Sequence, residues 1–169
     1  MNKILENARQ MYKLKNLVRY NNSTRIKDET VLEHTAAVSL IVLDLRNKYK
    51  FDVDKAIKLA LVHDILESEI SDIPYNVKSS YPAIAKSVKQ SELDAMFKFS
   101  STVKSLLNEL DNNSNHIEQR IVKFADIISC KLYTEMEVSL GNTNYMQKVL
   151  DETNQRIIDF EKELEEFLE

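Results

Sequence analysis

Two histidines and two aspartates stand where the surrounding helical pattern predicts apolar residues or the edge of the core: His34, His63, Asp64 and Asp126. A buried carboxylate that meets no cation is costly in free energy, so each aspartate would need a positively charged partner. Two imidazoles and two carboxylates form a mixed nitrogen and oxygen donor set, which suits Mn, Fe, Co, Ni or Zn. The four residues therefore form a candidate site for a divalent transition metal.

Each of these residues also has an interpretation that involves no metal. His34 could be a hydrogen-bonded histidine of the core, and Asp126 could pair with the nearby Lys123. Glu33 could serve only as the acid of a capping box, and His116 is expected at the surface. Helical periodicity alone leaves both interpretations open.

The candidate residues come from three predicted helices. Thr30 and Glu33 match a capping box, and the helix that follows places His34 on its core-facing stripe. A second helix is expected to be capped by Asp52 or Asp54. These caps set where the first two helices begin.

The His63-Asp64 pair lies inside this second predicted helix, which is expected to end before Pro74. Glu67 follows three and four residues later, so it can reach the same side of the helix. Lys78 is expected in the loop beyond Pro74. Asp64 itself falls on the stripe predicted to be buried, together with Ile57, Ala60, Leu61 and Ile65.

A long third helix is predicted after the polar stretch 111–115, and it carries Asp126 at the edge of its buried stripe. Gly141 is expected to end this helix. The buried stripe is predicted to contain Ile117, Ile121, Ala125, Ile128 and Leu132. Further helices are predicted over residues 2–18, 81–98 and 102–110, and from about residue 144.

The composition favours one domain built of helices. The chain has 169 residues, a length that one substantial core can serve, so residues 1–169 are predicted to form a single domain. It contains only 1 Gly and 2 Pro, whereas sheet proteins of this size need many tight turns that draw on both. We therefore predict an all-α fold, a single compact helical domain of about six or seven helices.

The charge and cysteine content exclude several classes of function. The net charge of −4 provides no electrostatic footprint for a nucleic acid polymer or an anionic membrane. Cys130 is the only cysteine, so no intrachain disulfide is expected and a reducing cytoplasm fits best. The N-terminal residues lack the apolar region of a signal peptide. The most apolar run, residues 36–43, is too short to span a bilayer.

The motifs stand in a characteristic order along the chain: Arg19-Tyr20, Glu33-His34-Thr35, His63-Asp64-Ile65-Leu66-Glu67, Asp72-Ile73-Pro74, Lys78 and Ala125-Asp126. This order resembles the signature of the HD-domain metal-dependent phosphohydrolases, and its spacing resembles their bacterial 5′-deoxynucleotidase branch. The matching stretches run from about residue 14 to residue 137. Members of that branch remove the phosphate from deoxyribonucleoside 5′-monophosphates.

The resemblance implies an HD-type fold and an enzyme, a metal-dependent phosphoric ester hydrolase with a deoxynucleotide substrate. It implies a divalent metal cofactor, which could be Co, Mn, Zn, Ni, Fe or Mg. Glu67 would orient or deprotonate the attacking water, next to the catalytic ligand Asp64. The implied metal ligands are His34, His63, Asp64 and Asp126.

Four residues would contact the substrate if the resemblance is carried over. Arg19 would bind the phosphate with its planar fork, and Lys78 could add a second cation. Asp72 would contact the sugar end of the nucleotide, and Tyr20 would help to shape the sugar pocket.

Two departures from the branch pattern bear on substrate choice. The branch usually has Arg-Trp where this chain has Arg19-Tyr20, and Gly-Asp where it has Ser71-Asp72. Selection of deoxyribose over ribose is therefore an open question. Small HD enzymes, some encoded by phages, use similar residues to hydrolyse deoxynucleoside triphosphates, and this alternative also stays open. The alarmone hydrolases typically show His-Asp-x-x-Glu-Asp, which the serine after Glu67 disfavours.

A third alternative is a helical binding module that keeps the fold without turnover, although no expected ligand or candidate base is missing. The resembled branch also tends to form homodimers. The amphipathic last helix could supply such an interface, or it could complete the core of the monomer.

Overall fold

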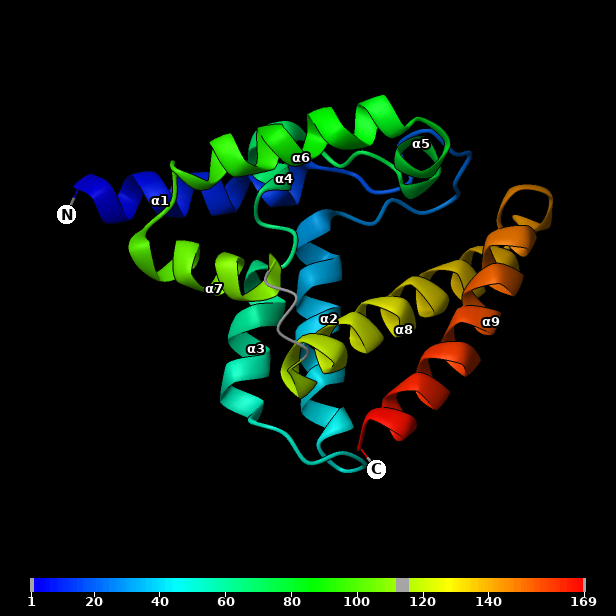
Figure 1. Cartoon of the computed structure of the whole chain (residues 1–169). Coiled ribbons are helices and arrows are strands. Elements are labelled where there is room, and N and C mark those ends of the chain that lie inside the picture. Colours follow the sequence, from blue (N-terminus) through cyan, green and yellow to red (C-terminus); the bar gives the residue numbers. More distant parts are fainter. Residues whose placement is uncertain (1, 112–115, 169) are drawn as a thin grey trace.

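The computed structural model describes residues 2–111 and 116–168, most of which lie in helices (Figure 1). In chain order these are α1 (Asn2–Tyr12), the 3₁₀ turn η1 (Lys13–Asn16), α2 (Val31–Leu45), α3 (Val53–Val62), α4 (Glu67–Ile70), α5 (Tyr75–Ser80), α6 (Pro82–Met96), α7 (Ser101–Asp111), α8 (Ile117–Ser139) and α9 (Thr143–Leu168). Within the described residues, one isolated bridge between Val18 and Thr30 is the only strand-like pairing. The all-α prediction is confirmed, whereas the single domain over residues 1–169 stays a prediction.

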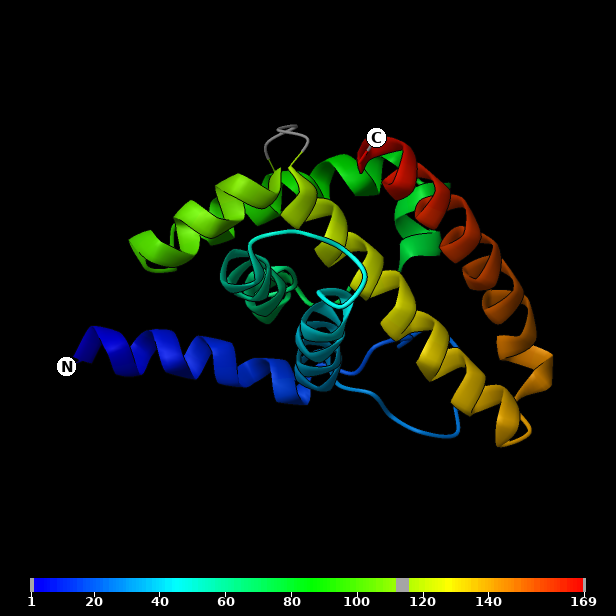
Figure 2. The same ribbon diagram turned by 90° about the horizontal axis from the view of Figure 1, so that it is seen from below.

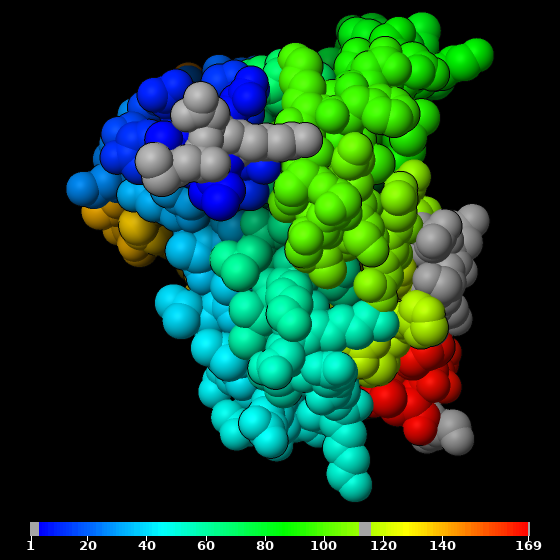
Figure 3. Space-filling model, turned by 90° about the vertical axis from the view of Figure 1, so that its left-hand side faces the viewer, coloured from blue at the N-terminus to red at the C-terminus, as the bar shows by residue number. Residues whose placement is uncertain are grey.

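The main core forms where α2, α3, α8 and α9 pack together, with α9 running back along α8 (Figures 1 and 2). Its fully buried side chains include Val38, Val42, Leu59, Ala60, Ile121, Ala125 and Leu164. A second apolar cluster joins η1, the start of α2, the end of α3, and α7 through Leu14, Val31, Val62, Val103 and Leu107. Figure 3 shows the face to which α1, α3 and α7 contribute, and on it α3 packs against α7.

The α2 helix carries His34 at the junction of these two clusters. Val31, one turn before His34, belongs to the second cluster, and Val38, one turn after it, belongs to the main core. The predicted capping box is confirmed, because the Thr30 hydroxyl accepts from the Glu33 N–H and the Glu33 carboxylate accepts from the Thr30 N–H. The helix start is therefore fixed locally, and His34 is fully buried as predicted.

His63 and Asp64 do not lie inside a continuous helix, which corrects the sequence prediction. The α3 helix ends one residue before His63, and α4 begins at Glu67. The His63 Nδ1–H donates to the Ala60 carbonyl at 2.6 Å, so the ring occupies an acceptor that the Asp64 N–H would use in a continued α-helix. The Glu67 N–H then bonds to the Asp64 carbonyl only three residues back, at 3.1 Å. The backbone winds more tightly here, as in a 3₁₀ helix, so His63 and Asp64 do not continue the α-helix of α3.

Two residues of the predicted buried stripes are exposed. Leu61 of α3 is 51% exposed and Leu132 of α8 is 52% exposed. Part of the reason is that α3 buries a different face, through Ala56 and Leu59. Asp52, one of the two expected caps, accepts the N-terminal hydrogen bond of α3.

The segment after Asp72 forms a short helix where a loop was predicted. Pro74 stands at the N-cap of α5 with φ −55, and a proline is compatible with a helix start because its fixed φ suits that position. Lys78 therefore lies in the last turn of α5. Gly141, with φ +102, ends the α8 region as predicted. No described helix is long and apolar enough to cross a membrane.

We expect Ser71→Gly to stabilise the protein. Ser71 has φ 72 and ψ 161, a region that costs a non-glycine residue about 1–3 kcal/mol. Relief of this strain should exceed the added entropy of glycine in the unfolded chain, so the free energy of unfolding should rise by about 1 kcal/mol in equilibrium urea unfolding. Ser105→Gly, at an exposed position within α7, is the matched control and should lower it by a few tenths of a kcal/mol. Equal losses in both variants would contradict the strain at Ser71.

Candidate metal centre

The structure brings the four candidate ligands together from three elements. His34 comes from α2, His63 and Asp64 come from the turn after α3, and Asp126 comes from α8. The His34 Nε2 lies 3.2 Å from Asp126 Oδ1 and 3.6 Å from Asp64 Oδ2. The His63 Nε2 lies 3.2 Å from Asp64 Oδ2 and 3.4 Å from His34 Nε2. One donor atom from each of His34, His63 and Asp64 lies within 4.8 Å of the others.

Both imidazoles are oriented through their other ring nitrogen. The Nδ1 of His34 lies 3.0 Å from the Ser129 hydroxyl, and the Nδ1–H of His63 donates to the Ala60 carbonyl. Each ring therefore presents its Nε2 to the cluster, which is how metal-binding histidines are commonly fixed by a second contact.

The contacts expected without a metal are present as well. The Lys123 ammonium lies 2.8 Å from Asp126 Oδ2, and the other oxygen of Asp126 faces His34. The hydrogen bond from Ser129 occupies only one nitrogen of His34. These contacts leave the cluster-facing atoms of both residues directed at each other and at Asp64. Neither contact alone accounts for a histidine between two carboxylates.

The pKa values follow from burial and from the pairing of opposite charges. Burial acts to raise the pKa of Asp64, but the charge of His63 and its hydrogen bond hold it at about 2. Burial acts to lower the pKa of His63, but the charge of Asp64, with help from Asp126, raises it to about 9. Burial also opposes ionisation of Asp126, whose pKa is nevertheless held well below its usual value by the His34 hydrogen bond and the Lys123 charge.

Glu67 stands beside the cluster as the first residue of α4. Its Oε2 is buried and has no hydrogen-bond partner among the described residues. Burial and the nearby charges of Asp64 and Asp72 raise the pKa of Glu67 to about 9. A buried acid with an unpartnered oxygen is costly unless water or a ligand fills the space in front of it.

These observations fit a divalent metal. The donor set combines two imidazole nitrogens with carboxylate oxygens, which is a transition-metal set. A cation at this point would offset the negative charge of Asp64 and Asp126, and it would bring ordered water within reach of the buried Glu67 oxygen. The site therefore has the residues to bind a divalent ion, whose identity they do not fix.

A pocket of about 190 Å³ opens beside the cluster and contains Lys78. His63, Asp64 and Glu67 are among the residues that line it. The rest of its lining comes from α6, α7 and the chain before α4, through Leu66, Lys89, Glu92, Leu93, Met96, Leu107, Leu110 and Asp111. Lys78 and the candidate metal ligands thus share one cavity.

Arg19 and Tyr20 lie against α8, where they contact Cys130 and Tyr133. The Arg19 guanidinium donates to Glu29 Oε2 at 2.7 Å and to Cys130 Sγ at 3.3 Å, and it lies over the Tyr20 ring. The Tyr20 ring stacks on Tyr133 with centroids 4.9 Å apart. Arg19 is therefore held rigidly, with Glu29 balancing its charge.

Asp72 is linked to this group through the backbone. The Asn21 side-chain amide donates to the Asp72 carbonyl at 2.8 Å. Burial raises the pKa of the Asp72 carboxyl, an effect that the charge of Arg19 partly offsets. The substrate candidates therefore fall into two groups, Lys78 inside the 190 Å³ pocket and Arg19, Tyr20 and Asp72 around the neighbouring loops.

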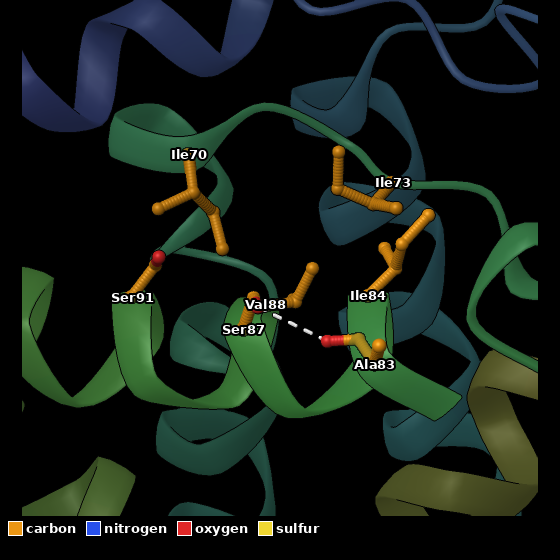
Figure 4. Close-up of a pocket in the computed structure, with 7 residues that line it drawn as sticks. All are labelled: Ile70, Ile73, Ala83, Ile84, Ser87, Val88 and Ser91. Carbon is orange, nitrogen blue, oxygen red and sulfur yellow. Dashed lines mark hydrogen bonds between the residues drawn. The ribbon is translucent and has the colours of Figure 1, made fainter. Parts of the chain in front are cut away.

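A larger cavity of about 320 Å³ contains none of the candidate residues (Figure 4). It lies between α6 and the chain around α4, and the side chains of Ile70, Ile73, Ile84 and Val88 point toward one another across it. Its lining offers only two serine hydroxyls as polar side-chain groups, so it lacks the groups that phosphate chemistry requires.

Sequence reasoning missed several residues that complete the site. Ser129 orients His34, while Glu29 and Cys130 hold Arg19. Cys130 follows Asp126 by four residues, so helical spacing could have placed it on the same side of α8. The contact between Ser129 and His34 spans 95 residues of chain, and no local pattern indicates it.

Comparison with known proteins adds independent findings. Residues 8–169 match the family model described as 5′-deoxynucleotidase YfbR-like. A 5′-deoxynucleotidase of Vibrio parahaemolyticus is 31% identical over 157 residues, which cover 85% of this chain and 81% of that protein. An HD-domain phosphohydrolase of Listeria innocua has a TM-score of 0.77 at 18% identity, covering 98% of this chain and 85% of that one. The HD phosphohydrolase of cyanophage S-2L, bound to dA and one catalytic Zn²⁺ ion, has a TM-score of 0.61 at 16% identity, covering 94% and 96%.

We expect the metal-free protein to lose stability as the pH rises from about 6.5 to 9. The folded-state pKa of His63 is raised from 6.5 to about 9, and that of Glu67 from 4.5 to about 9. In this window the folded protein keeps protons that the unfolded chain has released, so the free energy of unfolding falls by about 3 kcal/mol for each of the two groups. Urea unfolding in EDTA at several pH values measures this loss.

The Glu67→Gln variant separates the two contributions. It removes the carboxyl, so the fall with pH should become shallower while the His63 part remains. A stability that is flat or rises over this window in the metal-free wild type would contradict the pairing of His63 with Asp64.

Proposed function

The chain belongs to the YfbR-like 5′-deoxynucleotidase family, and from this membership we propose that it removes the 5′-phosphate from deoxyribonucleoside monophosphates in a metal-dependent hydrolysis. The observation that carries this proposal is the convergence of His34, His63 and Asp64 beside the buried, unpartnered Glu67 oxygen. An enzyme of this class needs a metal site and a general base within one cavity.

We propose His34, His63, Asp64 and Asp126 as the metal ligands. When bound, a divalent ion lowers the pKa of a water molecule and stabilises negative charge on the phosphoryl oxygens. The imidazole donors favour a transition ion over Mg²⁺, which prefers oxygen ligands. The zinc named for the cyanophage enzyme supports zinc as one candidate, along with Mn, Co, Ni and Fe.

Glu67 is proposed to orient the attacking water and to accept its proton. Its carboxyl is protonated at neutral pH in the metal-free protein, because burial and the neighbouring carboxylates raise its pKa to about 9. A cation next to it favours the ionised form, since an opposite charge lowers the pKa of an acid. The same residue would therefore become competent as a base when the site is loaded.

The substrate residues are proposed from their charges and surroundings. Arg19 presents a guanidinium suited to phosphate oxygens, and Lys78 lines the pocket beside Glu67. Asp72 and the ring of Tyr20 would contact the sugar. The dA bound to the cyanophage enzyme supports a deoxynucleoside as the organic part of the substrate.

Triphosphate hydrolysis remains the alternative activity, and the charges of the pocket argue against it. Lys89 is already paired with Asp111 and lies 3.9 Å from Glu92. These two acids leave Lys89 little net positive charge with which to bind further phosphates in the pocket. The monophosphate is therefore the preferred substrate.

Two further properties stay predictions. A cytoplasmic location rests on the unpaired Cys130. A homodimer is the second, and light scattering would test it. The α9 helix buries Met146, Leu150 and Leu164 inside the monomer, so these side chains are not available to a dimer interface.

We expect phosphate release from dAMP, dTMP and dCMP when Mn²⁺, Co²⁺ or Zn²⁺ is added. The products should be identified chromatographically, with dATP and the ribonucleotide AMP assayed in parallel. Inorganic phosphate and a nucleoside are the expected products from the monophosphates. Release of triphosphate from dATP, with the monophosphates intact, would replace the proposal by the alternative, and no turnover of any nucleotide would favour a binding module.

We expect Asp64→Ala and Glu67→Gln to abolish activity in different ways. Asp64→Ala removes a metal ligand, so both metal content and activity should fall. Glu67→Gln should keep the metal and lower kcat by at least about 100-fold, the usual scale of general base catalysis. Elemental analysis and phosphate release measure the two effects.

Glu69→Gln is the matched control for Glu67→Gln. Glu69 lies on the same short helix but pairs with Lys13 and Lys98. Its substitution should leave kcat unchanged. Full activity in Glu67→Gln would remove Glu67 from the chemistry.

A further inference from the structure

The chain between η1 and α2 forms a loop that carries the proposed phosphate and sugar residues. We call residues 19–29 the substrate loop, because Arg19 and Tyr20 stand at its start. Its ends are tied together, since the Arg19 N–H donates to the Glu29 carbonyl at 2.9 Å and the Val31 N–H donates to the Leu17 carbonyl at 2.8 Å. The two ends of the loop are therefore fixed. Its far side, residues 24–27, is held by separate contacts.

A buried glutamate of α8 anchors this far side. Glu137 is fully buried, and its carboxylate accepts from the Ile26 N–H at 2.8 Å and from the Lys27 N–H at 2.6 Å. The Asn142 side-chain amide donates to the same carboxylate at 2.6 Å. Three donors surround one buried charge, which is a strong arrangement because hydrogen bonds to an ionised group are the stronger kind.

Asn142 extends this anchor to a third residue of the loop. Its side-chain amide also donates to the Thr24 carbonyl at 2.9 Å. Gly141 adopts φ +102 and so turns the chain for the Asn142 N–H to reach the Glu137 carbonyl at 3.0 Å. Gly141 is the only glycine of the chain, and a side chain there would be strained by that φ alone.

Tyr133, one turn before Glu137, holds both the loop and the aromatic ring at its start. Its hydroxyl donates to the Lys27 carbonyl at 2.7 Å. Its ring stacks on Tyr20 with an interplanar angle of 14°. Tyr20 has φ 53, a conformation that a non-glycine residue keeps only when its surroundings hold it.

The loop also forms hydrogen bonds to the segment that contains Asp72. Asn21 donates to the Asp72 carbonyl, and Asn22 donates to Asn76 Oδ1 at 3.2 Å. The segment that carries the proposed sugar contact is therefore tied to the same loop. Disturbing the loop would move both sides of the sugar pocket.

One face of α8 links the loop to the metal centre. Asp126, Cys130, Tyr133 and Glu137 follow one another at spacings of four, three and four residues, which places them along one side of a helix. Over these eleven residues the helix rises about 16 Å. This face contacts, in order, the metal ligand cluster, Arg19, Tyr20 and the far side of the loop.

We propose that Glu137 is a positioning residue for nucleotide recognition, which acts by docking the substrate loop on α8 at a fixed distance from the metal ligands. This inference rests on the proposed function and adds to it a residue remote from the chemistry. Glu137 itself touches no substrate. It sets where Arg19, Tyr20 and Asp72 stand when a deoxynucleotide binds.

Glu137→Gln is the direct test, because the amide keeps one acceptor oxygen and places an NH₂ group against donors. We expect the KM for dAMP to rise by about tenfold or more with kcat within about threefold of the wild type, the pattern of lost binding rather than lost chemistry. Metal content should stay unchanged.

Glu118→Gln provides a matched control on the same helix. Glu118 is also a buried glutamate that accepts a backbone N–H, from Asp52 at 3.1 Å, but it lies at the opposite end of α8. Its substitution should lower stability without changing the KM for dAMP. If Glu137→Gln likewise loses only stability, its role is structural and the proposal is overturned.

Two variants of Tyr133 keep the proposal testable if Glu137→Gln does not fold. Tyr133→Phe loses the bond to the Lys27 carbonyl and keeps the stack on Tyr20, whereas Tyr133→Leu loses both. The KM for dAMP should rise further in Tyr133→Leu than in Tyr133→Phe. An unchanged KM in both variants would overturn the proposal.

Limited trypsin digestion separates this inference from the proposed function. Cleavage after Arg25 and Lys27 requires the loop to leave α8, so it should be faster in Glu137→Gln than in the wild type or Glu118→Gln. If the wild type hydrolyses no deoxynucleotide, the proposed function fails, while this difference still reports on docking. Equal cleavage rates in all three proteins would overturn the anchoring role of Glu137.

Discussion

The structure depends on keeping several carboxyl groups together in a largely buried space. Asp64 and Asp126 converge on two imidazoles, with the buried Glu67 next to Asp64, and water does not screen the repulsion among these carboxyl groups well there. Without a cation, bound protons reduce this repulsion, because the raised pKa values keep His63 charged and Glu67 neutral. A divalent ion would supply the positive charge directly and release those protons. Repulsion among the carboxyl groups is unfavourable without a cation, and for the same reason these groups favour the binding of a metal ion.

The break between α3 and α4 lies at the metal-ligand cluster, because His63 and Asp64 stand in the turn that joins these two helices. The His63 ring takes the Ala60 carbonyl, the winding tightens, and the Nε2 of His63 comes to lie 3.2 Å from the carboxylate of Asp64. The side chain that is proposed to bind the metal thus also shapes the backbone that presents it. Glu67 then starts a new short helix on the same side.

The sequence predicted the features that local chemistry determines. The capping box at Thr30 and the burial of His34 follow from spacing within one helix, and both are confirmed. The helix break at His63 was not predicted, because it depends on a side chain competing for a backbone acceptor rather than on apolar periodicity. The exposure of Leu61 depends on which face of α3 meets its neighbours. Glu137 holds a loop more than one hundred residues away in the chain, and no pattern in a single sequence marks such a contact.

The two departures from the family pattern coincide with the two non-glycine residues of positive φ in the described chain, Tyr20 and Ser71. Each stands next to a proposed substrate residue, Arg19 in one case and Asp72 in the other. At Ser71 the backbone keeps a conformation suited to glycine although the residue does not favour it. Neighbouring contacts must therefore offset the cost of the strained backbone at these positions. They include the hydrogen bond from Asn21 to the Asp72 carbonyl and the stack of Tyr133 on Tyr20. The backbone geometry next to these two proposed substrate residues is thus imposed by tertiary contacts.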